Sequence, residues 1–98
     1  MLVRYADKKL ERLEFEAGYT AGFGPDIIKA FRKRMQYIRQ ATNEQDFYRM
    51  RSMHYEKLKG KRSHQRSMRL NDQFRLILEI QTTPDGRTVV VVSVEDYH

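Results

Sequence analysis

The pattern of apolar and polar residues changes along the 98-residue chain from helical spacing to strand alternation. In the N-terminal half, apolar residues recur every three or four positions, which is the period of an amphipathic helix. From about residue 65 onward, apolar and polar residues alternate, which is typical of half-buried strands. The pattern therefore predicts an α+β fold in which N-terminal helices cover a small sheet.

Two helices are predicted in the N-terminal half, after a short strand over residues 2–5. The first begins at Lys8, because Asp7 is a residue type that caps helix N-termini, and Gly18 ends it. Its apolar face consists of Leu10, Leu13 and Ala17. The second begins near Pro25, since proline suits the first helical position. Its apolar stripe consists of Ile27, Phe31, Met35, Ile38 and Thr42.

The segment between the helices and the strands is less regular. Thr42 and Gln45 have the spacing of a capping box, which predicts a short helical turn through about Met50. Residues 51–60 show no clear period, so both a short strand and a wrapped loop remain open.

A basic hairpin is predicted over residues 65–70 and 74–82, with Asn71-Asp72-Gln73 as its turn. Asn and Asp favour tight turns because they tolerate positive φ and bond their own backbone. A three-residue loop sets Leu70 opposite Phe74 and Arg69 opposite Arg75. Like charges that face each other are unfavourable alone, so the arginine pair indicates a bound anion. Along the first strand, one face carries Arg66, Met68 and Leu70, and the other carries Ser67 and Arg69.

A last strand is predicted over residues 89–94, after the turn Thr83-Pro84-Asp85-Gly86. Its β-branched and small residues suit an internal strand. Pairing Thr83 with Arg87 gives a core face of Phe74, Leu76, Leu78 and Ile80 against Asp96, Val94, Val92 and Val90. The opposite face then gathers Arg69, Arg75, Glu95 and Tyr97 at one end. A one-residue slip reverses this assignment.

The positive charge is concentrated in one part of the chain. Between Arg49 and Arg75 lie nine basic residues and two acids, a net charge of +7 against +6 for the whole chain. This concentration indicates a polyanion partner, either nucleic acid or an acidic protein segment. The alternative is a solvated basic face that aids solubility.

Composition excludes several other classes. The chain has no cysteine, so it has neither a disulfide framework nor a thiolate metal site. The three histidines, at 54, 64 and 98, do not have a recognisable metal spacing. No apolar run approaches the ~20 residues of a spanning helix, and the N-terminal segment lacks the apolar core of a signal peptide. We therefore expect a cytoplasmic protein that does not contact a membrane.

Three segments carry a resemblance to a known family: Leu58-Lys59-Gly60, the run SMRLNDQFR at 67–75, and the terminal Glu95-Asp96-Tyr97-His98. Together they resemble the HigB branch of the RelE/ParE toxin superfamily, the toxins of bacterial type II toxin–antitoxin pairs. The resemblance covers the whole chain. It implies a single RelE-like domain over residues 1–98, with a small, mostly antiparallel, twisted sheet packed against two N-terminal helices.

The resemblance also implies a function. Such toxins are ribosome-dependent endoribonucleases, or mRNA interferases, which cut messenger RNA in the 30S decoding site without metal or cofactor. The implied partners are mRNA on the ribosome, ribosomal RNA and a helix-turn-helix antitoxin similar to HigA. On matching positions the implied catalytic residues are His54, Arg69, Arg75, Asp96, Tyr97 and His98. The basic stretch adds substrate-binding candidates: Lys57, Lys59, Lys61, Arg62 and Arg66.

These residue types fit metal-independent RNA cleavage. Attack of the 2′-hydroxyl on the adjacent phosphate needs a base, an acid and positive charge on the phosphate. Histidine titrates near neutral pH, and the planar fork of arginine suits phosphate. His54 and His98 are expected to share proton transfer, but which one is the base stays open. In the simpler alternative, His98 is a frayed tail, His54 is a surface histidine and Arg75 only pairs with Glu95.

Two other functions remain open. One is a poison of DNA gyrase similar to ParE, which acts by binding a protein. The other is an RNA or ribosome binder without catalysis. The terminal Asp-Tyr-His and the paired arginines favour the nuclease, because a protein-binding surface needs no proton-transfer groups.

Overall fold

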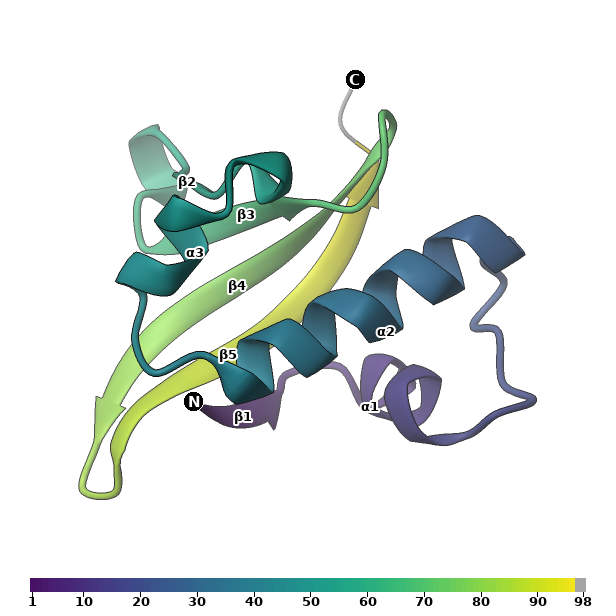
Figure 1. Cartoon of the computed structure of the whole chain (residues 1–98), viewed down its shortest axis with the longest axis horizontal. Helices are drawn as coiled ribbons and strands as arrows, with labels where there is room; N and C mark the ends of the chain where they lie inside the picture. Colours follow the sequence, from purple (N-terminus) through teal and green to yellow (C-terminus); the bar gives the residue numbers. More distant parts are fainter. Residues whose placement is uncertain (97–98) are drawn as a thin grey trace.

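The computed structural model describes residues 1–96 and contains a five-stranded sheet with three α-helices. In chain order the elements are β1 (Leu2–Tyr5), α1 (Lys8–Phe15), α2 (Pro25–Gln40), α3 (Gln45–Arg49), the 3-10 turn η1 (Arg51–Met53), β2 (Glu56–Lys57), the 3-10 turn η2 (Gly60–Arg62), β3 (Gln65–Arg69), β4 (Phe74–Thr83) and β5 (Gly86–Asp96). The strand order is β1-β5-β4-β3-β2, antiparallel except for β1 and β5. Helix α2 crosses the sheet diagonally, with α1 beside it (Figure 1). The predicted α+β fold is confirmed.

The two N-terminal helices begin where the sequence predicts. The Asp7 side chain accepts a hydrogen bond of 2.9 Å from the backbone N–H of Lys9, and Pro25 occupies the first turn of α2. The stripe of α2 is buried against the sheet, since Ile27, Phe31, Met35 and Ile38 are at most 3% exposed. Burial of these four apolar side chains helps to hold α2 on the sheet.

Both helices end earlier than the apolar pattern predicts. Ala17 and Thr42, the expected last members of the two stripes, lie outside the helices and are exposed. The backbone N–H of Glu16 closes the last turn of α1 on the carbonyl of Arg12, after which the chain turns away. Beyond α2, it is Ala41 that is buried.

Helix α3 forms as predicted, but the capping box does not. The carboxylate of Asp46 accepts the N–H groups of Thr42 and Asn43, and the Asn43 side chain accepts the N–H of Gln45. The turn therefore uses the short side chains of Asn43 and Asp46 in place of the Thr-Gln pair, because their oxygens reach N–H groups within four residues. The Phe47 side chain is fully buried and anchors this short helix to the core.

The basic hairpin has the predicted register. Arg69 pairs with Arg75, and the N–H of Leu70 donates to the carbonyl of Phe74 at 3.0 Å. The turn itself does not use positive φ, which within residues 1–96 occurs outside glycine only at Ala21 and His54. Instead, Asn71 Oδ1 accepts the N–H groups of Gln73 and Phe74 at 2.8 and 2.7 Å.

The register of β4 with β5 was predicted correctly for one half only. Phe74 pairs with Asp96 and Leu76 with Val94, as expected, but Thr83 pairs with Gly86 and not with Arg87. A two-residue loop, Pro84-Asp85, shifts the register, and a β-bulge between Ile77 and Leu78 restores it.

The corrected register changes the core. Leu78 pairs with Val91 and Ile80 with Val89, and both valines are fully buried. The prediction that Val90 and Val92 face the helices was therefore wrong, because Val89 and Val91 are the buried positions. At the bulge, one valine of this uninterrupted β-branched run has no pairing partner on β4. The residues of β5 that precede the bulge therefore face the opposite way from the one that simple alternation predicts.

Candidate functional site

The polar face of the sheet, opposite the face that packs on α1 and α2, carries a row of side chains across neighbouring strands. Arg69 on β3 lies opposite Arg75 on β4, and Arg75 lies opposite Glu95 on β5. His54 precedes β2, whose register with β3 brings it level with Arg69. A cavity of about 300 Å³ forms there, lined by His54, Arg69, Asn71, Asp72 and Arg75.

His54 is held in an unusual backbone conformation. Its φ of 46° and ψ of 48° lie in the left-handed region, which costs a residue other than glycine on the order of 1 kcal/mol. Its neighbours Met53 and Tyr55 are buried, with the Tyr55 hydroxyl donating to Glu44 at 2.8 Å. The backbone is therefore fixed on both sides while the imidazole stays exposed at the cavity.

Arg75 ties this segment to the sheet. Its residue is 7% exposed, and its Nη2 donates to the backbone carbonyl of His54 and lies 3.7 Å from a carboxylate oxygen of Glu56. Arg75 is thus a buried cation that holds His54 in position.

Arg69 is more accessible. Its side chain is 37% exposed, donates to the carbonyl of Asn71 at 3.3 Å and pairs with Asp72, whose own side chain is 94% exposed. An exposed ion pair of this kind is weak, so the guanidinium can exchange Asp72 for another anion.

A third arginine reinforces the positive potential beside the cavity. Arg34 of α2 donates from Nε to the carbonyl of Arg69 at 3.0 Å. Burial, and then the nearby charge of Arg69, lower the pKa of Arg34. Three guanidinium groups around one strand end favour an anion there.

The five predicted substrate-binding residues separate into three groups. Lys57, Lys59 and Lys61 are exposed and form no ion pair within residues 1–96. Arg62 binds both carboxylate oxygens of Glu95, at 2.9 and 2.8 Å, and this bond lowers the pKa of Glu95. Arg66 lies on the helix-facing side, where it pairs with Glu44 at 3.2 Å, so the structure does not bring it to the cavity.

The C-terminal candidates are less completely placed. Asp96 pairs with Phe74, accepts a hydrogen bond from Gln73 Nε2 at 2.9 Å, and does not line the cavity. Tyr97 and His98 lie outside the described residues. Their position beside the arginines stays a prediction.

Two lining residues were not among the candidates. Asn71 and Asp72 reach the cavity because the hairpin turn folds over the end of β3, next to Arg69. The predicted turn already placed both residues directly after Arg69, so the signal was present in the sequence. Asn71 also donates to Asp26 at 3.3 Å, which ties the turn to the first turn of α2.

Two further classes of site are absent from the described part of the chain. No helix among residues 1–96 has the length and apolar character needed to span a bilayer. In the same residues, no cluster of three or more His, Asp or Glu side chains is arranged to hold a metal ion.

Comparisons with known proteins agree with the fold and identify the family. A family model described as the RelE-like toxin HigB of type II toxin–antitoxin systems matches residues 3–98. The fold is similar to a YoeB/ParE toxin from Agrobacterium tumefaciens, with a TM-score of 0.61 and 16% identity over 100% of both chains. It is also similar to a chain of the RelBE2 toxin–antitoxin complex from Mycobacterium tuberculosis, with a TM-score of 0.52 and 19% identity over 98% of this chain and 96% of that one.

No curated protein matches the sequence significantly. The family match extends over almost the whole chain and includes every residue that lines the cavity. The chain therefore belongs to the HigB-like toxins, the RelE-like toxins of type II toxin–antitoxin systems.

Proposed function

We propose that this toxin is a ribosome-dependent endoribonuclease that cuts messenger RNA in the decoding site and so stops translation. The observation that carries the proposal is the cavity on the polar face, where an exposed histidine meets two arginines. A proton-transfer group beside fixed positive charge is what phosphodiester cleavage requires. A surface that only binds a protein needs no such pairing.

The reaction proposed is attack by the RNA's own 2′-hydroxyl. A base removes the 2′-hydroxyl proton, and the oxygen forms a bond to the adjacent phosphorus. The bond from phosphorus to the 5′-oxygen breaks, and an acid donates a proton to that leaving oxygen. The products are a 2′,3′-cyclic phosphate and a free 5′-hydroxyl, and no external water or metal is consumed.

The side chains of the cavity suit different parts of this reaction. Arg69 is the accessible cation, so we assign it to the phosphate, where its fork can bind two oxygens. Arg75 is buried against the His54 carbonyl, so its main role is to position His54. His54 is one proton-transfer residue. The second is His98, with Asp96 and Tyr97 beside it, as the family resemblance implies.

The exposed lysines suit binding to the ribosome. Lys57, Lys59 and Lys61 extend from β2 to η2 without an acidic partner within residues 1–96. We propose that they contact ribosomal RNA or message backbone, since such contacts need charge but no fixed geometry. For Arg62 to contact RNA in the same way, its ion pair with Glu95 must first break.

The antitoxin partner follows from the family. The similar RelBE2 structure is a toxin–antitoxin complex. We propose a helix-turn-helix antitoxin similar to HigA as the neutralising partner of this chain.

Induced expression in bacterial cells tests the function. The proposal predicts rapid decay of messages and arrest of translation, and His54→Gln removes both effects. His64→Gln is the matched control, because His64 is also exposed but does not line the cavity. Filamentation with a DNA-damage response would instead identify a gyrase poison. Growth arrest with intact messages would identify a binder without catalysis, and either result contradicts the proposal.

A further inference from the structure

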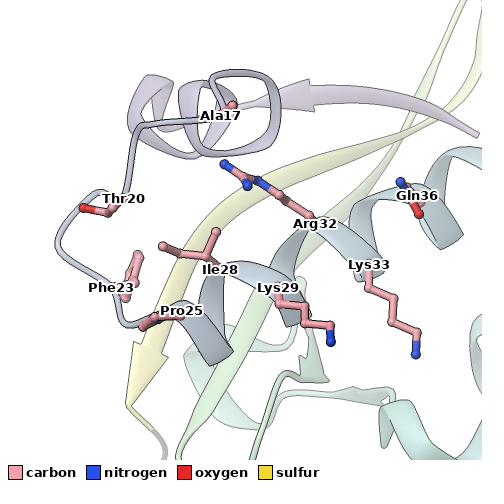
Figure 2. Close-up of a pocket in the computed structure, with 9 residues that line it drawn as sticks. All are labelled: Ala17, Thr20, Phe23, Pro25, Ile28, Lys29, Arg32, Lys33 and Gln36. Atoms are coloured by element: carbon pink, nitrogen blue, oxygen red, sulfur yellow. The ribbon is translucent and has the colours of Figure 1, made fainter.

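A second hollow lies on the helical side of the molecule. It has a volume of about 720 Å³ and runs between α2 and the segment 16–24, which connects α1 to α2 (Figure 2). It shares no lining residue with the cavity on the polar face. The volume lies within the usual range for binding sites, roughly 300–1,000 Å³. We call it the hairpin groove, because the two helices form a hairpin around it.

The apolar part of the hairpin groove is already in place. Phe23 is half-buried and packs edge-to-face on Phe74 of β4, with ring centroids 6.1 Å apart. Ile28 on α2 is half-buried against the core. Figure 2 shows Phe23 and Ile28 side by side, with Ala17 across from them where the chain leaves α1. A partner would bury apolar atoms there without first rearranging the chain.

Hydrogen bonds fix the two walls relative to each other. Arg32 reaches from α2 to the end of α1 and the start of the connecting segment, where it donates to the carbonyls of Leu13 and Glu16 at 2.9 and 3.0 Å. In the connecting segment, the N–H of Phe23 donates to the carbonyl of Thr20 at 2.9 Å. The N–H of Gly22 donates to the Thr20 hydroxyl at 3.2 Å.

These bonds restrict the kind of occupant. Neither wall is a strand edge, and much of the backbone in both walls is already hydrogen-bonded. An extended peptide would therefore find no ladder of donors and acceptors to pair with. A helix satisfies its own backbone and needs only side-chain contacts, so a helix fits this groove better.

The edge of the groove is basic. Lys29 and Lys33 lie one turn apart on α2, and both are exposed. Neither forms an ion pair within residues 1–96, and no acidic residue lines the groove. Figure 2 shows both ammonium groups on the same side of α2, away from the connecting segment. A partner with acids along one side complements this edge.

We propose that the hairpin groove binds an acidic amphipathic helix of a partner protein. Apolar side chains of that helix lie on Phe23 and Ile28, and its carboxylates face Lys29 and Lys33. The groove follows α2 from Pro25 to Gln36, about 17 Å at 1.5 Å per residue, so it accommodates roughly three turns. In a toxin–antitoxin pair, the antitoxin is the protein expected to supply such a helix. The groove shares no lining residue with the polar-face cavity, so this inference is independent of the nuclease proposal.

Two labelled peptides of about 14 residues test the charge preference. Both repeat leucine at helical spacing, and one carries glutamate where the other carries lysine. By fluorescence anisotropy, the toxin is expected to bind the acidic peptide at least about tenfold more tightly. Lys29→Glu with Lys33→Glu should reverse this preference. Lys8→Glu with Lys9→Glu makes the same charge change on exposed α1 residues outside the groove and should retain it.

A steric variant tests the location. Ala17 is exposed and lines the groove, so Ala17→Trp should fill it and abolish binding without disturbing the core. Gln40→Trp places the same side chain at an exposed position outside the groove and should bind normally. All these variants should still cleave message, so loss of peptide binding is distinguishable from failure of the nuclease proposal.

Several outcomes would overturn the inference. If the acidic peptide is weakened equally by the two charge-reversed double variants, its binding depends only on the total charge of the toxin. If the peptide still binds to Ala17→Trp, its binding site is not the hairpin groove. Displacement by a short RNA, or a stable dimer of the toxin that Ala17→Trp disrupts, would assign the groove to RNA or to a second copy. A toxin that binds neither peptide lacks the proposed site.

Discussion

Replacing Arg75 with methionine tests whether a buried cation holds the histidine segment on the sheet. Methionine keeps an unbranched apolar side chain but removes the guanidinium. The change removes the guanidinium donor of the part-buried His54 carbonyl, and a hydrogen bond to a charged group contributes about 1.5–3 kcal/mol. Loss of the 3.7 Å contact with half-exposed Glu56 adds under ~1 kcal/mol. Relief of repulsion with Arg69 acts in the opposite direction.

The net expectation for Arg75→Met is a loss of about 2 kcal/mol in the free energy of unfolding. Arg69→Met is the matched control, since it removes the same charge from the directly opposite position. Its partner Asp72 is almost fully exposed, so the expected loss is under ~1 kcal/mol. Denaturant titration followed by far-ultraviolet circular dichroism measures both, because the chain has no tryptophan.

The relative stability of the two variants tests the roles assigned to the two arginines. If Arg75→Met unfolds at the same denaturant concentration as the parent, the His54 carbonyl does not depend on it. If Arg69→Met is the less stable variant, the assignment of one positioning and one phosphate-binding arginine is wrong.

Three further predictions concern other parts of the molecule. Burial raises the pKa of Glu14, but hydrogen bonds from Arg39 and Tyr5 outweigh it and hold this pKa below 4.5. The ionised Glu14 side chain therefore stabilises the fold fully above about pH 5, and this stabilisation is lost as the pH falls through the lowered pKa. The difference in unfolding free energy between the parent and Glu14→Gln should accordingly vanish at low pH. Asn71→Ala removes two short bonds to backbone N–H groups, so thermal or denaturant unfolding should show a loss of about 1–2 kcal/mol, whereas Asp72→Ala should change little. Neutralising Lys57, Lys59 and Lys61 to glutamine should lower the salt dependence of single-stranded RNA binding by roughly two counterions, whereas glutamine at exposed Lys8, Lys9 and Lys33 should not.

The hairpin could be predicted from the sequence because local rules agree there. Alternation on the first strand and Asn-Asp in the turn both place Arg69 opposite Arg75, and the structure has that pairing. The same alternation placed Arg66 with Met68, on the helix-facing side, where it pairs with Glu44. That prediction should have removed Arg66 from the substrate-binding candidates.

Other features of the fold and of the site could not be predicted from the local sequence. The run Val89 to Val92 is uniform, so it carries no alternation from which a bulge or a shifted register can be read. His54 stands in an irregular segment, and its place at the cavity depends on buried Met53 and Tyr55, which are tertiary contacts. Only the family resemblance identified it. Charge alone likewise did not distinguish Arg62, which binds Glu95, from the lysines beside it.

The central claim is that the cavity cuts RNA through the message's own 2′-hydroxyl. The most direct test places a message on programmed ribosomes, with one 2′-deoxy substitution at the nucleotide before the cleaved bond. We predict that the unmodified message is cut to a 2′,3′-cyclic phosphate and that the free message is not. We also predict that the 2′-deoxy message remains intact and that His54→Gln and Arg69→Met abolish cutting. Cleavage of the 2′-deoxy message, or full activity of the His54 variant, would contradict the account.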